Sequence, residues 1–263
     1  MKLLRFYILL SVAFLMVSCE DLIEVDLNSA NPKVVIEADL NDLSNRQVIR
    51  VSRTVDFSSP ISSEAITGAK VTVMDSKGKL FDFVDKGDGI YVKEGFKPVV
   101  GLSYDLTVKV GEEAFQSSTK MNPFVPVDSI AVKEETVFSK TYYSVVLKFE
   151  DPIDIPNYYK YDIAINGKGF KFASAYSDKF NDGLYVSHQV TDRDNSIELG
   201  DSVVVRRQCV AKEVYTYWNQ IQMMNPGSAA PANPTSNLSN GALGYFSVSS
   251  AKEYGVRIVK EDD

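Results

Sequence analysis

The sequence predicts a mainly β protein, in which an N-terminal β-sandwich is followed by a second β-rich domain with one α-helix. Three observations predict it. Apolar and polar residues alternate with a period of two along most of the chain. These short segments are separated by turns rich in Gly, Asp and Asn. One clear segment, residues 212–224, instead has the 3.6-residue period of an amphipathic helix.

The first 18 residues are typical of a signal peptide. Lys2 and Arg5 give a positive start, residues 6–17 are apolar apart from one serine, and Ser18 precedes Cys19. The apolar run is too short for a transmembrane helix, which needs about 20 residues. The segment resembles the lipobox of bacterial lipoproteins, which implies cleavage after Ser18 and acylation of Cys19. The alternative is an ordinary secretory signal with a chance cysteine.

Residues 19–32 are predicted to be a lipidated tether. Glu20 and Asp21 directly follow Cys19, which resembles the acidic tag that sends Bacteroidota lipoproteins to the cell surface. The alternative is a simple solvated tether. We therefore expect a lipid anchor in the outer membrane, at the cell surface or in the periplasmic leaflet.

Composition excludes some classes of partner. Residues 1–18 hold two of the 28 basic residues and none of the 35 acidic ones, so the mature chain carries a net charge of −9. An acidic surface disfavours nucleic acid and anionic lipid headgroups. Only Cys209 remains beside Cys19, so no disulfide can form within the folded chain.

The first domain is placed at residues 33–122. Gly111 and Glu112 are expected to form a two-residue hairpin turn. Evenly spaced short strands predict a β-sandwich. The strands are expected around residues 34–36, 49–55, 71–73, 80–84, 90–92 and 104–110.

One motif within this domain resembles transthyretin-like and carboxypeptidase-regulatory-like domains. The resemblance implies an immunoglobulin-like or transthyretin-like sandwich and carries no information on function. It rests on Gly68, Ala69, Val71, Val73, Asp75, Gly78, Gly89, Tyr91, Gly101, Tyr104, Leu106 and Val108.

The second domain is placed at residues 123–263, after a boundary marked by Pro123 and Pro126. Alternation predicts half-buried strands at residues 143–149 and 159–165, and the turn at Asn166-Gly167 favours a hairpin. Further strands are expected at residues 184–190, 203–210, 241–246 and 256–259. The helix at 212–224 presents Val214, Tyr217, Trp218, Ile221 and Met224 on one face.

Nearly the whole chain resembles an uncharacterised family of Bacteroidota outer-membrane lipoproteins, a domain of unknown function. Its members are often encoded beside TonB-dependent receptors, which implies a TonB-dependent receptor as partner. The resemblance rests on Cys19 with its acids, Val34-Val35-Ile36-Glu37, Val51-Ser52-Arg53-Thr54, Gly68-Ala69-Lys70-Val71, Asp128-Ser129-Ile130 and the blocks at 231–238 and 241–246.

The residues show no convincing catalytic or cofactor pattern, so we expect neither an enzyme nor a bound cofactor. His188 is the only histidine, which excludes a multi-histidine zinc site within the chain. It is expected on the polar side of a strand, at the surface or hydrogen-bonded. Cys209 is expected to be a buried structural thiol.

Oxygen ligands alternate in the run Asp192, Asp194 and Glu198, as they do in calcium loops, although the central glycine is missing. The alternative there is a solvated turn.

The ligand-binding candidates are aromatic and amide side chains. Tyr158, Tyr159 and Trp218 belong to aromatic clusters that could stack on sugars or grip a partner, or could simply pack the core. Asn233 and Asn237 lie in the long loop 227–240, which is either functional or a draped connection.

Two triplets suggest a covalent modification. Asp128-Ser129-Ile130 and Asp201-Ser202-Val203 match the short O-glycosylation signal of exported Bacteroidota proteins, which makes Ser129 and Ser202 candidate sites.

Three functions follow in order of preference. The first is a non-enzymatic envelope lipoprotein that captures a ligand for a TonB-dependent transporter or caps its barrel. The second is a structural or adhesive surface protein. The third is a carboxylate-based glycoside hydrolase, which needs only two acids.

Overall fold

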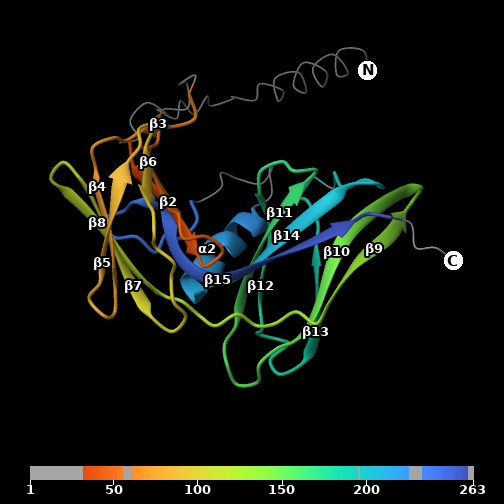
Figure 1. Ribbon diagram of the computed structural model, residues 1–263. Helices are drawn as coiled ribbons and strands as arrows, with labels where there is room; N and C mark the ends of the chain where they lie inside the picture. Colours follow the sequence, from red (N-terminus) through yellow and green to blue (C-terminus); the bar gives the residue numbers. More distant parts are fainter. Residues whose placement is uncertain (1–31, 56–60, 195, 225–232, 260–263) are drawn as a thin grey trace, which may run out of the picture.

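The protein is mainly β, as the sequence predicts (Figure 1). The computed structural model describes residues 32–55, 61–194, 196–224 and 233–259. The predictions for the signal peptide, for Cys19 and for residues 20–31 of the tether therefore lie outside the described residues.

The described chain forms fifteen strands and one helix. The strands in the first half are β1 (Val34–Asn41), β2 (Gln47–Arg53), β3 (Glu64–Ala65), β4 (Lys70–Asp75), β5 (Leu80–Asp85), β6 (Ile90–Lys93), β7 (Ser103–Val110) and β8 (Glu113–Lys120). Then follow β9 (Ser129–Val137), β10 (Lys140–Glu150), β11 (Tyr158–Ile165), β12 (Lys171–Ser177), β13 (Tyr185–Val190), β14 (Ser202–Cys209), α2 (Lys212–Met223) and β15 (Leu243–Arg257).

Strands β1 to β8 form a two-layer sandwich. In one layer β1, β2 and β6 are neighbours, in the other β4, β7 and β8, and β5 pairs with both β6 and β4. Alternate side chains from both layers, such as Ile36 and Ile49 from one and Val73 and Leu106 from the other, share one core. The predicted turn is confirmed, because Val110 pairs with Glu113 across Gly111, whose φ is 59°.

Strand β15 ties the two halves of the chain together. Its residues 243–249 pair with β1, and its residues 250–257 pair with β14. Figure 1 shows β15, drawn in blue, running through the middle of the molecule from one half to the other. The β1–β15 pairing is parallel, unlike the other described strand pairs. No local pattern in the sequence predicts it.

Gly244 permits this close pairing. Its φ is +88°, and a Cβ at this position would lie 2.1 Å from the carbonyl oxygen of Ile36. Only glycine tolerates both the positive φ and the approach of the neighbouring backbone.

The predicted domain boundary at residues 122–123 stays a prediction, but the chain beyond it contributes to both cores. Leu238, Ala242, Phe246 and Val248 pack into the first core together with strands β1 to β8. A unit ending at residue 122 therefore lacks part of its hydrophobic core.

The second core lies between two sheets. The small sheet β13-β10-β9 packs against one face of β11, β14 and the second part of β15. Its side chains include Leu147 and Phe149 from β10 and Tyr159, Tyr161 and Ile163 from β11.

Helix α2 covers the opposite face of this sheet. It lies against β12, β11 and β15, with Val214 buried and with Tyr217 and Trp218 partly buried against Tyr245. The predicted helix is thus confirmed, with its end at Met223. The half-buried character predicted for residues 159–165 is wrong for most of the strand: six consecutive residues of β11 are buried, because α2 covers the face that alternation assigns to solvent.

Candidate functional site

Two loops at one end of the second core form the strongest candidate site. One is the β10–β11 loop, residues 151–157, and the other is the β12–β13 loop, residues 178–184. They lie at the lower end of the C-terminal half in Figure 1, beside the label of β13. Asp151-Pro152 ends β10, because proline has no N–H to continue the strand pairing.

Backbone hydrogen bonds join the two loops. The N–H of Asp151 donates to the carbonyl of Leu184 (2.9 Å), and the N–H of Asp178 donates to the carbonyl of Asn157 (3.2 Å). Gly183, with φ +68°, lies so close to Ile153 that a Cβ there would be 3.0 Å from the isoleucine side chain. The two loops therefore form one packed unit.

Three carboxylates meet where the loops join. One oxygen from each of Asp151, Asp178 and Asp182 lies within 4.8 Å of the others. Asp151 is only 2 % exposed and Asp178 only 9 %, whereas Asp182 is exposed. Burial raises the pKa of Asp151, as do the nearby charges of Asp178 and Asp182. The site thus places three carboxylates close together, two of them largely shielded from water.

A groove and a set of exposed apolar side chains lie beside Asp151. The groove has a volume of about 650 Å³, and its lining includes Asp151, Ile153, Ile155 and Gly183. The two loops and the start of β13 expose large apolar side chains to solvent, which we call the loop surface: Ile153 (69 % exposed), Ile155, Phe180 (82 %), Leu184 and Tyr185. Exposed apolar groups gathered in this way mark surfaces that bind other molecules.

Arg207, on β14, is fully buried. Its guanidinium carbon is 3.8 Å from the ring centre of Phe149 and 4.4 Å from that of Tyr159. Its Nη1 donates to the carbonyl of Val125 (2.5 Å), while Nε and Nη2 have no hydrogen-bond partner among the described residues. The guanidinium charge is thus stabilised by cation–π contacts with these two rings.

His188 is buried beside Arg207, which corrects the prediction of a polar-side position. Strand β13 turns Val186, His188 and Val190 inward, so the histidine is 4 % exposed. Its Nδ1 lies 2.8 Å from the Tyr161 hydroxyl, which confirms the predicted hydrogen bond. Burial, and then the charge of Arg207, lower the pKa of His188 to about 3.

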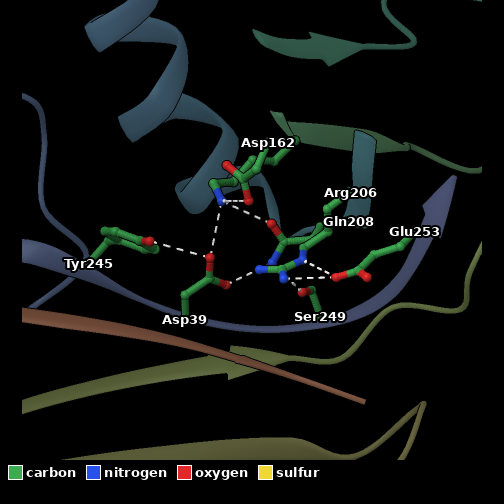
Figure 2. Close-up of polar contacts among 8 residues, drawn as sticks. Asp39, Asp162, Arg206, Gln208, Tyr245, Ser249 and Glu253 are labelled. Atoms are coloured by element: carbon green, nitrogen blue, oxygen red, sulfur yellow. Dashed lines mark hydrogen bonds and ion pairs between the residues drawn. The ribbon is translucent and has the colours of Figure 1, made fainter. Parts of the chain in front are cut away.

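A second polar cluster surrounds Lys160, beneath Trp218 of α2. Figure 2 shows its members Asp39, Asp162, Gln208 and Ser249. The ammonium of Lys160 donates to Asp162 (2.7 Å), Asp39 (3.0 Å) and the side-chain oxygen of Gln208 (2.9 Å). Gln208 in turn donates to Asp39 (2.8 Å) and to the Ser249 hydroxyl (3.2 Å).

All three N–H groups of this buried ammonium have partners. Burial alone would lower the pKa of Lys160, but the charges of Asp162 and Asp39 raise it above the usual value. A lysine that stays charged and fully bonded is not poised for proton transfer or nucleophilic attack. The cluster joins β1, β11, β14 and β15, so its role is structural.

The aromatic ligand-binding candidates lie in packed surroundings. Tyr159 is buried in the second core, and its hydroxyl donates to Asp151. Tyr158 packs on Tyr215, with ring centres 5.2 Å apart. Trp218 stacks on Phe172 at 4.4 Å, and the ammonium of Lys160 lies 5.0 Å from its ring centre. Packing accounts for all three, while their binding role stays a prediction.

The loop candidates differ from each other. Asn237 is bonded to β15: its side chain donates to the carbonyl of Phe246 (2.8 Å) and accepts from the Phe246 N–H (2.9 Å). The Ser117 hydroxyl donates to the Asn237 carbonyl (2.7 Å), which ties the loop to β8. Asn233 is exposed. Residues 227–232 of the loop lie outside the described residues.

Within the described residues, the acids of the predicted calcium run do not form a group whose ligand oxygens are close enough to share one ion. Asp192 is buried and accepts from the Ser196 hydroxyl, whereas Asp194 and Glu198 are exposed. Within the described ranges, the trio that could hold an ion is Asp151, Asp178 and Asp182. Asp151 lies 27 positions before Asp178 in the sequence and in the other loop, so residue spacing could not reveal the trio.

The remaining candidates are the two serines of the glycosylation triplets and the thiol of Cys209. Ser129 and Ser202 are exposed at the first residues of β9 and β14, and their glycosylation stays a prediction. Cys209 is 2 % exposed, which confirms the buried thiol, and burial raises its pKa.

The chain belongs to a family of unknown function. The model of the family described as "Domain of unknown function (DUF4249)" matches residues 20–254. No curated protein matches the chain. Within the described residues, no helix has the length and apolar character needed to cross a bilayer.

Proposed function

We propose that this protein is a lipid-anchored envelope protein without catalytic activity, and that it serves an outer-membrane TonB-dependent transporter by capturing its ligand or capping its barrel. The loop surface is the observation that carries the proposal. Phe180 is 82 % exposed and Ile153 is 69 % exposed, on two loops that hydrogen-bond to each other. Such a surface suits docking against a protein.

The anchor supports the location. Lys2, Arg5, the apolar run 6–17 and Cys19 follow the order of a lipoprotein signal. The Bacteroidota origin, the outer-membrane position and the TonB-dependent partner come from the family resemblance. Several acyl chains on Cys19 give stable attachment where one chain would be marginal.

The buried reactive groups support a non-catalytic role. His188 and Cys209 are engaged in the second core, and Lys160 is fully bonded beneath α2. A histidine whose pKa is about 3 is a poor base near neutral pH. The structural or adhesive alternative uses the same loop surface, with a second copy or a host surface as partner.

The test is copurification of an identified TonB-dependent receptor with the C-terminally tagged chain from outer membranes in mild detergent. We expect a stoichiometric receptor with the wild type and its loss in the double variant Ile153→Ser, Phe180→Ser. The matched control is Phe138→Ser, which removes an aromatic side chain that is 98 % exposed on the β9–β10 hairpin.

Recovery of the chain alone or as a homopolymer would reject the transporter role and favour the adhesive alternative. The anchor is tested separately by the intact mass of the mature protein. An acylated N-terminal cysteine is expected in the wild type, and release from the membrane is expected in Cys19→Ala.

A further inference from the structure

We propose that Asp151, Asp178 and Asp182 form a divalent-cation site, of the kind that takes Ca²⁺, and that the ion joins the β10–β11 loop to the β12–β13 loop. This inference goes beyond the proposed function and does not depend on it. It also differs from the calcium run expected at residues 192–198.

The spacing of the carboxylates fits such an ion. One oxygen of each of the three residues lies within 4.8 Å of the others. Calcium binds oxygen at about 2.3–2.6 Å, so two ligands of one ion lie at most about 5 Å apart. The three oxygens are therefore close enough to share one cation.

Asp151 supplies a second, independent observation. The residue is 2 % exposed, and its Oδ2 is buried with no hydrogen-bond partner among the described residues. Its Oδ1 accepts from the Tyr159 hydroxyl. Burying a carboxylate oxygen without a donor or a cation is costly, and native structures rarely do it. A cation among the three acids removes this cost and the repulsion between their charges.

The carboxylates are also held in place before any ion binds. Each is oriented by one donor, which is how proteins fix the ligands of a metal site. The donors are the Tyr159 hydroxyl for Asp151, the Asn157 N–H for Asp178 (2.5 Å) and the Asp154 N–H for Asp182 (3.0 Å). Asp151 also lines the groove, which offers room for water ligands next to it.

The ion would order the surface that the proposed function uses. Ile153 and Phe180 lie in the two loops that the site joins. Calcium would thus couple the divalent-ion concentration around the protein to the order of these loops.

The experiment is a calcium titration of the purified full-length chain in mild detergent, after treatment with a chelator. We expect one ion per chain, with a dissociation constant at or below about 10⁻³ M, the range of extracellular calcium modules. Calcium should also raise the midpoint of thermal unfolding and slow hydrogen exchange in residues 151–157 and 178–184.

The variant Asp182→Asn tests the assignment. Asp182 is exposed, and an asparagine oxygen can still accept from the Asp154 N–H, so the variant should fold. We expect its calcium affinity to fall at least tenfold. The matched control is Asp194→Asn, which removes an exposed acid of the run at 192–198 and should leave binding unchanged.

Terbium gives a measurement that needs no variant. The Tyr159 hydroxyl bonds to Asp151, so terbium bound at this site should show tyrosine-sensitised emission that calcium displaces. The absence of saturable binding up to about 5 mM calcium, above the extracellular range, would overturn the proposal. Binding that survives Asp182→Asn but is lost in Asp194→Asn would also overturn it.

Discussion

Acid pH should destabilise this protein through its single histidine. His188 is buried, and its pKa is about 3 in the folded chain against 6.5 as its usual value. Between pH 6.5 and pH 3, His188 therefore binds a proton in the unfolded chain but not in the folded chain. The stability due to the neutral histidine is fully present above pH 6.5, and it is lost as the pH falls from 6.5 towards 3.

The size of the effect follows from the two pKa values. At pH 4.5 the unfolded histidine lies two pH units below its pKa, while the folded histidine is still neutral. Each unit corresponds to about 1.4 kcal/mol, so the free energy of unfolding should fall by about 3 kcal/mol between pH 7.5 and pH 4.5.

The assay compares the wild type with His188→Gln, which cannot titrate and keeps a group able to bond to the Tyr161 hydroxyl. The free energy of unfolding in urea is measured for both proteins from pH 7.5 to pH 4.5. Because both contain the same carboxylates, the contribution of those groups cancels in the difference between the two proteins. The gap between their unfolding free energies should change by about 3 kcal/mol in favour of the variant. A gap that stays constant with pH would refute the reasoning. The chain has one histidine, so its NMR titration can be followed without assignment.

Three further changes test the packing. Gly244→Ala should lower the free energy of unfolding by at least about 2 kcal/mol, because its φ is +88° and its Cβ would meet the backbone of β1; Gly255→Ala in the same strand meets no atom within 4 Å and should cost far less. Lys160→Met removes the cation that pairs with the buried Asp162 and should cost about 3–5 kcal/mol in urea unfolding, and adding Asp162→Leu should recover part of that loss. Cys209 should resist a thiol reagent in the native protein and react in urea, since it is 2 % exposed; rapid reaction without denaturant would contradict the buried position.

Local patterns predicted the elements of the fold well. Period-two alternation marked the strands, and Gly111 and the Asn166-Gly167 pair marked turns where the backbone has positive φ. The 3.6-residue period placed α2 to within one residue of its observed end. These features depend on a few adjacent residues, so the chain specifies them without knowledge of its distant partners.

Alternation failed where the environment on both sides of a strand mattered. Lys160 and Asp162 have the spacing of solvent-facing residues, yet both are buried because α2 covers that face and Asp39 supplies the opposing charge from β1. The predicted polar-side position of His188 was wrong for a related reason. A neutral, hydrogen-bonded histidine is compatible with an apolar core, so its polar side chain does not indicate which face of the strand it occupies.

The sequence by itself determined the class of the fold and the acidic charge that disfavours nucleic acid, and it predicts cleavage before Cys19 and a lipid anchor on that residue. Only the tertiary structure decided that β15 pairs in parallel with β1, and that Asp151 comes within reach of Asp178 and Asp182. The physical reason is that hydrophobic periodicity specifies which face of an element is buried. It does not specify which distant segment covers that face, because that choice depends on the packing of the whole chain.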